Sequence, residues 1–331
     1  MKITFEPANL NQSMYDSNSK GVSYTAGFFI TIALAVAGIF IGSFISIPVW
    51  MAMTGKGLED MKDQLSNPAY SNAFKVIQAI STLIGFFIPT VITAALLNYK
   101  PYHLLGFTRK FQWKQAGLVI AIMFLALFVS TAFGYLNQHV PLPDTLRSFF
   151  QKLEDEYNSQ VQAIMQLKNF GDYLLGLAVM AFLPALCEET LFRGGLQNFL
   201  TRSSKMPWLS ILIVSFLFSV VHFSFYGFLP RMFLGIILGL IFYYTGSLWL
   251  CILAHFFNNA FAVTQYYFSN DPSIKQMAQQ DAPLSLVYLG LISIPFLIAL
   301  LVVLKRTSPR QQEESLSLND VQNKAPWEID N

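Results

Sequence analysis

The chain has few charged residues for its length. Of its 331 residues only 12% are charged, whereas 54% are hydrophobic, and the mean hydropathy is +0.46. A soluble domain normally carries about 25% charged residues, so this composition excludes an ordinary water-soluble fold. The formal net charge of +2 is too small to indicate binding to nucleic acid. The apolar residues are therefore expected to face lipid.

Cysteine is also scarce. The two cysteines, Cys187 and Cys251, both lie in apolar segments and do not form a C-x-x-C spacing. Their number and positions argue against a disulfide framework and against a thiolate zinc site. Any chemistry of this chain is therefore expected to depend on other side chains.

Apolar residues occur in runs long enough to cross a bilayer, which takes about 20 helical residues. Barrel strands would alternate apolar and polar residues over about ten positions, and these runs do not alternate. Backbone amides in lipid must be paired within their own segment, so the runs are expected to be helices. We therefore predict an all-α polytopic membrane protein with about eight transmembrane helices. Their centres lie near Ile39, Ile88, Leu125, Ala185, Ser215, Ile236, Ala254 and Ile294.

The distribution of basic residues predicts the orientation, because Lys and Arg accumulate on the cytoplasmic side of membranes. The loop 99–114 carries four basic residues and no acidic residue, and further basic residues follow the last helix. Acidic residues concentrate in other loops, around residues 59–63, 144–156 and 271–281. Both termini are therefore predicted to be cytoplasmic.

The same patterns divide the chain into regions. We expect residues 1–21 to form a cytoplasmic tail, residues 22–306 the transmembrane bundle, and residues 307–331 a polar, disordered cytoplasmic tail. Residues 149–167 combine apolar positions at helical spacing with charged neighbours, which predicts an amphipathic helix on the outer surface.

Small residues predict close contacts between helices. Gly38 with Gly42, and Gly235 with Gly239, have the G-x-x-x-G spacing that lets two helix backbones approach each other in a membrane. We expect both pairs to pack within the bundle.

Polar residues inside the predicted membrane helices require a reason, because a charged side chain there costs at least about 2.5–3.5 kcal/mol on insertion scales. Three runs contain such residues: Glu188, Glu189 and Arg193 in the fourth, His222 in the fifth, and His255 with Asn259 in the seventh. Counting helical rise from the predicted helix ends places these groups at similar depths, about 12–21 Å from the cytoplasmic face. They are therefore expected to converge.

The spacing of these residues suggests their roles. Glu189 and Arg193 lie four residues apart, so they share one helix face and can neutralise each other as a structural pair. Glu188 points about 100° away around the helix and is free to face a site. A carboxylate in an apolar pocket suits a general base that takes a proton from water.

The remaining groups complete a hydrolytic site. His222 is suited to hold or polarise the water, while His255 and Asn259, four residues apart, can donate hydrogen bonds to an oxyanion. The residues therefore predict hydrolysis of an amide or ester by activated water. The alternative interpretation is a buried polar network that only locks the bundle.

At this point the residues resemble a known family. The resemblance is carried by three motifs: Glu188-Glu189-x-x-x-Arg193, Phe218-x-x-x-His222 and His255-x-x-x-Asn259. They look like the signature motifs of the CAAX protease and bacteriocin-processing family (CPBP, also called Abi), which includes the type II CAAX prenyl endopeptidases. The resemblance covers roughly residues 174–264, the expected catalytic core.

The resemblance implies an eight-helix intramembrane endopeptidase with a cavity open toward the cytoplasm. It implies that Glu188 is the catalytic glutamate, that His222 orients water, and that His255 with Asn259 stabilises the oxyanion. The supporting residues are Glu189, Arg193 and Phe218, and Phe218 is interpreted as a packing residue that lines the site.

The family is often described as metalloproteases, since Glu188, His222 and His255 would give the two histidines and one glutamate of a zinc site. No H-E-x-x-H spacing is present. We favour a mechanism without a cofactor, because the carboxylate is better explained as a base.

Two other functions remain open. One is a proton-coupled transporter, because buried Glu and His residues also form proton relays. The other is a non-catalytic, immunity-type protein that holds a peptide in the same cavity. The expected partners are the lipid bilayer and a membrane-associated or lipidated peptide, and the expected location is a bacterial plasma membrane, with the endoplasmic reticulum as the alternative. The sequence identifies neither the substrate nor the oligomeric state.

Overall fold

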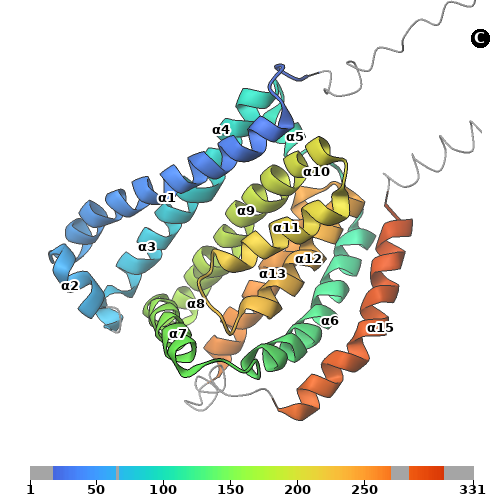
Figure 1. Ribbon diagram of the computed structural model, residues 1–331. Coiled ribbons are helices and arrows are strands. Elements are labelled where there is room, and N and C mark those ends of the chain that lie inside the picture. The colour runs from blue at the N-terminus through green and yellow to red at the C-terminus, as the bar shows by residue number, and fades with distance from the viewer. Residues whose placement is uncertain (1–17, 65–66, 270–282, 309–331) are drawn as a thin grey trace, which may run out of the picture.

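The computed structural model describes residues 18–64, 67–269 and 283–308 as a bundle of helices (Figure 1). Within these residues the only β-type pairing is an isolated antiparallel bridge between Ser19 and Asn98. The predicted all-α polytopic fold is confirmed.

The first half of the chain forms the helices α1 (Tyr24–Thr54), α2 (Leu58–Asp63), α3 (Ser71–Thr82), α4 (Ile88–Leu97), α5 (Pro101–Leu104), α6 (Trp113–Gln138) and α7 (Asp144–Ile164). The second half forms α8 (Phe170–Gly176), α9 (Leu183–Glu189), α10 (Asn198–Ser204), α11 (Pro207–Val220), α12 (Phe228–Thr245), α13 (Leu248–Phe268) and α15 (Leu284–Arg306). Short helices of other types complete the chain: the 3₁₀ turn η1 (Pro68–Tyr70) before α3, and the π-helices η2 (Leu83–Phe87), η3 (Leu177–Phe182) and η4 (Thr190–Gln197).

All eight predicted runs are helical, but they are not equally suited to cross a membrane. Among the described residues, six segments are long and apolar enough: Tyr24–Thr54, Pro68–Leu97, Trp113–Gln138, Phe170–Ser204, Phe228–Thr245 and Leu284–Arg306. Helix α11 has only 14 residues. Helix α13 falls outside the six because its polar residues lower its hydropathy. A total of eight crossings stays a prediction.

The described chain ends lie at the same end of the bundle (Figure 1). Near its start, Lys20 N–H donates to the carbonyl of Leu97, and near its end the Gln115 side chain donates to the carbonyl of Thr307. Helices α2 and α7 lie at the opposite end. This arrangement agrees with an even number of crossings, while the side of the membrane on which each end lies stays a prediction.

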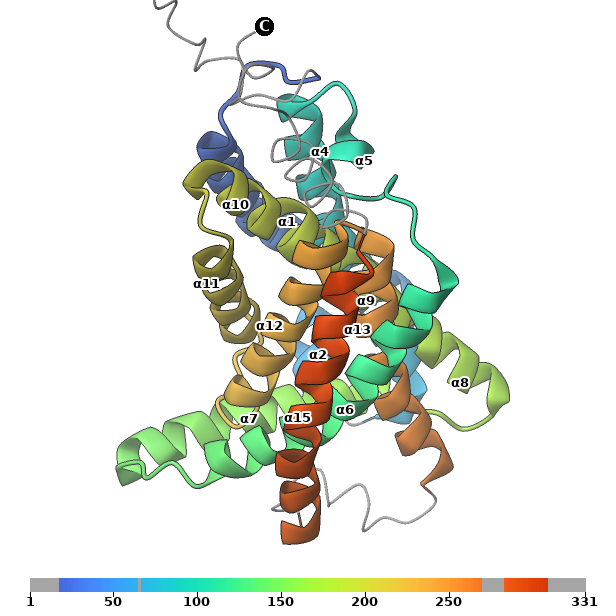
Figure 2. The same ribbon diagram turned by 90° about the vertical axis from the view of Figure 1, so that its right-hand side faces the viewer.

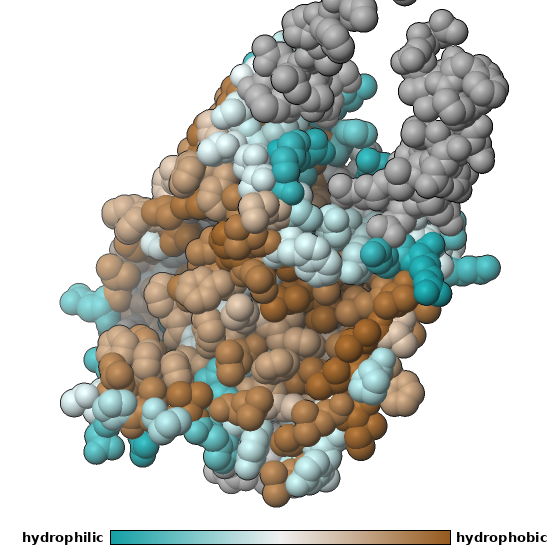
Figure 3. Space-filling model, turned by 45° about the vertical axis from the view of Figure 1, so that its right-hand side comes forward, coloured by the Kyte–Doolittle hydropathy of each residue, from teal (hydrophilic) through white to brown (hydrophobic). Residues whose placement is uncertain are grey.

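Apolar side chains cover the flanks of the bundle. Figure 3 shows hydrophobic residues over the middle of this face and hydrophilic residues toward both ends. Large side chains of α1 and α15 are mostly exposed, as with Phe44 at 71% and Phe296 at 61%. Such exposure is unfavourable in water, so these flanks fit contact with lipid.

The amphipathic helix predicted at residues 149–167 is confirmed as a helix, although α7 starts earlier, at Asp144. Pro143 immediately precedes it, and proline with an acidic residue in the first turn favours a helix start at this position. Helix α7 runs across the end of the bundle rather than along it (Figure 2). Two contacts fix it there: the ring of Phe150 stacks on Phe225 at 4.3 Å, and the Ser224 hydroxyl donates to Glu154.

Both glycine pairs pack inside the bundle, as predicted. A Cβ on Gly38 would collide with the carbonyl oxygen of Ile84, and one on Gly42 would lie 3.2 Å from Cα of Ser81. Helix α1 therefore contacts the segment from α3 to η2 backbone to backbone. The other pair packs just as closely. An added Cβ on Gly235 would lie 3.0 Å from Cβ of Ser215, and one on Gly239 would lie 2.9 Å from Oε1 of Gln197.

Three predictions fall wholly or mostly outside the described residues, and the first is the N-terminal tail at residues 1–21, of which residues 1–17 are not described. The other two are the polar tail predicted at residues 307–331, which is not described from residue 309 onward, and the acidic loop around residues 271–281.

Replacing Gly38 by alanine tests the backbone contact of α1. We expect Gly38→Ala to lower the free energy of unfolding by about 1–3 kcal/mol, because the added methyl group overpacks the contact with Ile84. The measurement is the thermal unfolding midpoint of the purified protein in detergent micelles. Gly117→Ala is the matched control, since Gly117 is exposed on α6 with no atom within 4 Å of the added Cβ, and its midpoint should not fall. Equal midpoints for the two variants would contradict the close packing.

Candidate active site

A cavity of about 720 Å³ lies among α3, α7, α9, α11, α12 and α13. The four residues predicted to carry the chemistry all line it: Glu188, His222, His255 and Asn259. Phe218 lines it as well. The structure therefore brings together side chains from three separate parts of the sequence, as their similar depths predicted.

Glu188 and Glu189 lie where the helix changes its geometry. The π-helix η3 precedes α9, and η4 begins at Thr190, immediately after Glu189. Pro184 follows η3 inside the continuous helix Phe170–Ser204, so its missing N–H cannot donate to the preceding turn. Single π-turns inside helices occur often at functional sites. The sequence pattern did not predict these π-helices.

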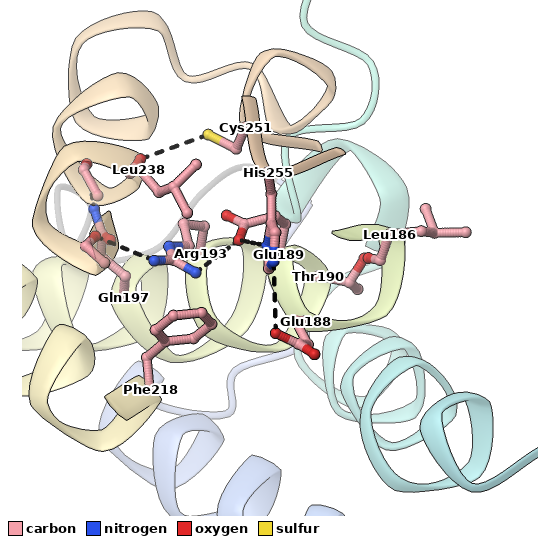
Figure 4. Close-up of polar contacts among 12 residues, drawn as sticks. Leu186, Glu188, Glu189, Thr190, Arg193, Gln197, Phe218, Leu238, Cys251 and His255 are labelled. Atoms are coloured by element: carbon pink, nitrogen blue, oxygen red, sulfur yellow. Dashed lines mark hydrogen bonds and ion pairs between the residues drawn. The ribbon is translucent and has the colours of Figure 1, made fainter. Parts of the chain in front are cut away.

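Glu189 lies at the centre of a buried chain of charged groups. Its Oε1 atom is 2.7 Å from Nη1 of Arg193 and 2.8 Å from Nδ1 of His255. Glu189 and Arg193 have almost no exposed surface, and Nη2 of Arg193 also donates to the carbonyl of Gly235 at 3.1 Å. Figure 4 shows Arg193 joined to Glu189 beside the ring of His255. The predicted pair of Glu189 and Arg193 is present, and it extends to a third group on α13.

Glu188 has a different environment from its neighbour. Its side chain is 13% exposed, and its Oε2 atom is buried with no hydrogen-bond partner. The nearest charged or titratable partner found for this oxygen is Nε2 of His255, at 3.9 Å, too far for a direct hydrogen bond (Figure 4). Oε2 of Glu189 also lacks a partner, but Glu189 is fully buried and does not line the cavity, so Glu188 is the carboxylate that is available to a molecule there.

The contact with Glu189 determines which nitrogen of His255 carries a proton. An ionised carboxylate only accepts hydrogen bonds, so Nδ1 of His255 must donate to Glu189. In the neutral ring Nε2 then has no proton and can only accept. His255 can donate from Nε2 toward the cavity only as the imidazolium, whose charge the carboxylate of Glu189 stabilises.

Phe218 packs against several members of the site. Its ring lies edge-on to His222 at 5.1 Å and to His255 at 5.9 Å, and Cζ of Arg193 lies 4.7 Å from its centroid. Nδ1 of His222 is 2.7 Å from the carbonyl oxygen of Phe218. As predicted, Phe218 is a packing residue that also lines the cavity, and it orients both histidine rings.

Asn259 is next to a second amide. The Asn258 side chain donates to Oδ1 of Asn259 at 3.0 Å, and both residues line the cavity. This bond uses the carbonyl oxygen of Asn259, so its NH₂ group keeps its capacity as a donor. Asn258 was not among the predicted site residues.

The possible zinc site is not assembled in this conformation. Within the described ranges, no group of three or more His, Cys, Asp or Glu side chains is close enough together to hold a metal ion. Glu188, His222 and His255 share the cavity without forming such a set. Metal dependence stays a matter for experiment.

The cavity includes residues that sequence reasoning missed. Helix α7 supplies one wall, with Glu156 and Tyr157 among the lining residues, and α12 supplies Arg231. A charge at Arg231, inside the apolar run centred near Ile236, was a signal that could have identified it. The wall formed by α7 could not be predicted, because it depends on how that helix folds back over the bundle.

The cavity extends toward one end of the bundle. It reaches from Glu188 to α7, at the end of the bundle opposite the described chain ends. The resemblance implies an opening toward the cytoplasm, whereas the distribution of basic residues predicts cytoplasmic chain ends. If the cavity opens beside α7, the two predictions do not agree.

A family model matches part of the chain. The family model described as Rce1-like, type II CAAX prenyl endopeptidase, matches residues 170–261, close to the predicted core of 174–264. No curated protein and no solved structure gives a significant match. The matched segment contains all the predicted site residues: Glu188, Glu189, Arg193, Phe218, His222, His255 and Asn259. The match confirms the resemblance that the three motifs predicted, and over residues 170–261 this membrane protein is similar to the type II CAAX prenyl endopeptidases of the Rce1-like family.

Proposed function

We propose that this protein is an intramembrane endopeptidase of the CAAX type, which hydrolyses a peptide bond in a membrane-associated or lipid-modified peptide. The observation that carries the proposal is the unpartnered carboxylate oxygen of Glu188, which faces His255 in a cavity among apolar helices. The family match over the same residues supports it.

Glu188 acts as the general base in this proposal. It takes a proton from a water molecule while the water oxygen forms a bond to the carbonyl carbon of the substrate. The tetrahedral intermediate collapses with cleavage of the C–N bond, and Glu188 returns the proton to the leaving amine. The Glu188 side chain is partly exposed and lines the cavity, so its carboxylate can accept the proton from a water molecule there.

Three other side chains assist the reaction. His222 holds the water through Nε2, since its Nδ1 is engaged by the carbonyl of Phe218. His255, as the imidazolium, and Asn259 donate hydrogen bonds to the oxyanion. These contacts are stronger in a cavity from which most water is excluded.

Glu189 and Arg193 act through His255. Glu189 accepts from Nδ1 of His255, which fixes the ring and keeps Nε2 directed to the cavity. Arg193 pairs with Glu189, so neither of these two buried groups lacks a partner of opposite charge. Both are therefore positioning residues.

The cavity suits a short peptide segment. Its volume of about 720 Å³ lies within the range of about 300–1,000 Å³ found for ligand sites. Apolar residues such as Leu234 and Val263 form much of its lining, and the surrounding helices face lipid. A lipidated client could therefore enter laterally from the bilayer. We place the protein in a bacterial plasma membrane, as the sequence led us to expect.

Replacing Glu188 by glutamine tests the assignment of the base. We expect kcat/KM of Glu188→Gln to fall by about 10²- to 10⁴-fold, because an amide cannot accept the proton from water. The thermal unfolding midpoint should stay close to that of the parent protein, since Oε2 makes no bond in the folded state. Cleavage is measured on a panel of farnesylated and unmodified C-terminal peptides in proteoliposomes. Membrane peptidomes of cells with either form would reveal natural clients. Full activity of Glu188→Gln would refute the assignment.

The adjacent glutamate provides a contrasting variant. Glu189→Gln leaves Arg193 buried without a counter-charge, so we expect the free energy of unfolding to fall by about 3–5 kcal/mol. The readout is the same thermal unfolding midpoint in detergent. If Glu189→Gln proved as stable as Glu188→Gln, the buried pair of Glu189 and Arg193 would not be needed to hold the bundle together.

Removal of metal ions tests the absence of a cofactor. We expect cleavage to be unchanged after dialysis against EDTA, because Glu188, His222 and His255 do not form a ligand set and Glu188 is explained as a base. Zinc content is determined in parallel by mass spectrometry. Loss of activity on dialysis, with recovery on adding zinc alone, would establish a metal-dependent mechanism instead.

A further inference from the structure

A separate cavity of about 490 Å³ lies at the end of the bundle that holds the described chain ends, where α5 and α10 lie (Figure 1). Its walls are the loop after α4, which includes α5, the segment from η4 to α10, and the C-terminal end of α12. No residue that lines it also lines the active-site cavity. The proposed hydrolysis therefore gives this second cavity no role.

The lining of this cavity carries positive charge and no negative charge. Its basic side chains are those of His103, Arg109, Lys110 and Arg202, and no acidic side chain is among the lining residues. Within the described ranges, none of these basic side chains takes part in an ion pair. The described acidic residues belong to α2, α7, α8 and α9 instead. The part of the chain that the structure describes therefore does not balance this charge.

Helix ends supply only part of the missing negative charge. Helices α10 and α12 both end beside this cavity, and the carbonyl groups at a helix C-terminus amount to about half a negative charge. Two such ends give about one negative charge, whereas Arg109, Lys110 and Arg202 carry one positive charge each. The basic side chains exceed what the helix ends require, so an anion can be accommodated.

Arg202 is held in one orientation by the protein itself. Its Nε atom donates to Oδ1 of Asn198 at 2.8 Å, and its Nη1 atom donates to the hydroxyl of Tyr24 at 3.3 Å. Asn198 is fixed in turn, because its amide donates to the carbonyl of Leu104 at 2.6 Å. Nη2 of Arg202 makes no hydrogen bond within the described residues. A guanidinium fixed in this way loses little conformational freedom when it binds a ligand.

The loop from α5 to α6 adds two cations to the lining. Arg109 and Lys110 are both exposed, and neither side chain has a hydrogen-bond partner among the described residues. Nε of Arg109 would lie 3.9 Å from a Cβ added to Gly246, so this side chain reaches the end of α12. Both cations are therefore available to a ligand in the cavity.

Aromatic side chains place this cavity at the depth of lipid headgroups. Trp208 is 57% exposed, and its ring lies 6.1 Å from that of Tyr243, which lines the cavity. Tyr102, next to the lining residue His103, and Trp249 are exposed as well. Exposed tryptophan and tyrosine side chains concentrate at membrane–water interfaces. The phosphate groups of lipids lie at this level, and basic pockets between membrane helices bind acidic headgroups.

We propose that this cavity binds the phosphate group of an anionic phospholipid. The forked donors of Arg202 and Arg109 match the oxygens of a phosphate, and Lys110 adds a further positive charge. The volume of about 490 Å³ suits a headgroup such as phosphoglycerol, while the acyl chains remain in the bilayer. A choline headgroup is disfavoured, because its cation would face the same basic side chains. This site goes beyond the proposed peptidase and does not depend on it.

The test compares two lipids that differ only in the headgroup. Short-chain phosphatidylglycerol and phosphatidylcholine are titrated into the full chain in a nonionic detergent, and their affinities are measured by thermophoresis. Phosphatidylglycerol should bind at least about 10-fold more tightly, because the positive cavity repels choline. Equal affinities for the two lipids would overturn the inference.

Three variants locate the binding site. Arg109→Gln and Arg202→Gln should each weaken phosphatidylglycerol binding by about 10-fold, through loss of a charge-assisted contact. Arg109 has no partner to lose in the folded protein, so its variant remains informative if Arg202→Gln is unstable. Lys114→Gln is the matched control, since Lys114 is exposed at the same end and does not line the cavity. Its affinity should stay within about 2-fold, because salt screens an exposed charge.

The same variants can refute the site. If Lys114→Gln weakens binding as much as Arg109→Gln, the lipid responds to the overall charge of this end and the cavity is not its site. Unchanged affinity in both Arg109→Gln and Arg202→Gln would refute the site as well.

Inorganic phosphate distinguishes a lipid from a soluble phosphate. It should bind at least about 100-fold more weakly than phosphatidylglycerol, because it lacks the acyl chains that bury apolar surface at about 0.8 kcal/mol per methylene group. If inorganic phosphate binds as tightly as the lipid, the cavity holds a soluble phosphate and the assignment to a lipid is wrong.

The variant Glu188→Gln separates failure of this inference from failure of the proposed function. It should keep the parent preference for phosphatidylglycerol, since the two cavities share no lining residue. A lipid preference in a protein that cleaves no peptide would refute the peptidase and retain the lipid site. Cleavage by a parent protein without any lipid preference would refute the lipid site alone.

Discussion

The carboxylate of Glu189 holds the functional half of the bundle together. With one oxygen it contacts Arg193 on its own helix segment and His255 on α13, and Arg193 in turn donates to the backbone of α12. Three helical segments are thus joined by groups that could not remain charged and separate in an apolar interior. The orientation of His255 depends on this contact, which Oε1 of Glu189 makes and the adjacent Glu188 does not.

Small residues make this polar cluster possible. Gly235 and Gly239 let α12 approach the segment that carries Arg193 and Gln197, so that both side chains reach backbone carbonyls. In lipid there is no hydrophobic force between helices, and close packing with buried hydrogen bonds takes its place. The same logic applies at Gly38, where α1 meets η2. Apolar flanks therefore surround a tightly packed and polar interior.

The sequence predicted the features that depend on patterns within a single helix. Helical runs followed from hydrophobicity, and the pairing of Glu189 with Arg193 followed from their separation by one turn. The bond from His255 to Glu189 depends on how α13 packs against α9, and no spacing encodes it. The π-helices and the wall formed by α7 likewise arise from tertiary packing. Arg231 could have been recognised as a charge in an apolar run, but its position in the cavity wall could not.

The adjacency of Glu188 and Glu189 has a consequence for the charge of the whole cluster. When His255 is protonated, two negative carboxylates are matched by the guanidinium of Arg193 and one imidazolium, so the group as a whole is neutral. A neutral cluster can lie within lipid without a counter-ion from outside. In the proposed hydrolysis the proton moves from water to Glu188 and then to the departing amine, which redistributes charge inside the cavity. These four groups therefore add no net charge to the interior of the bundle, although the proposed reaction among them is ionic.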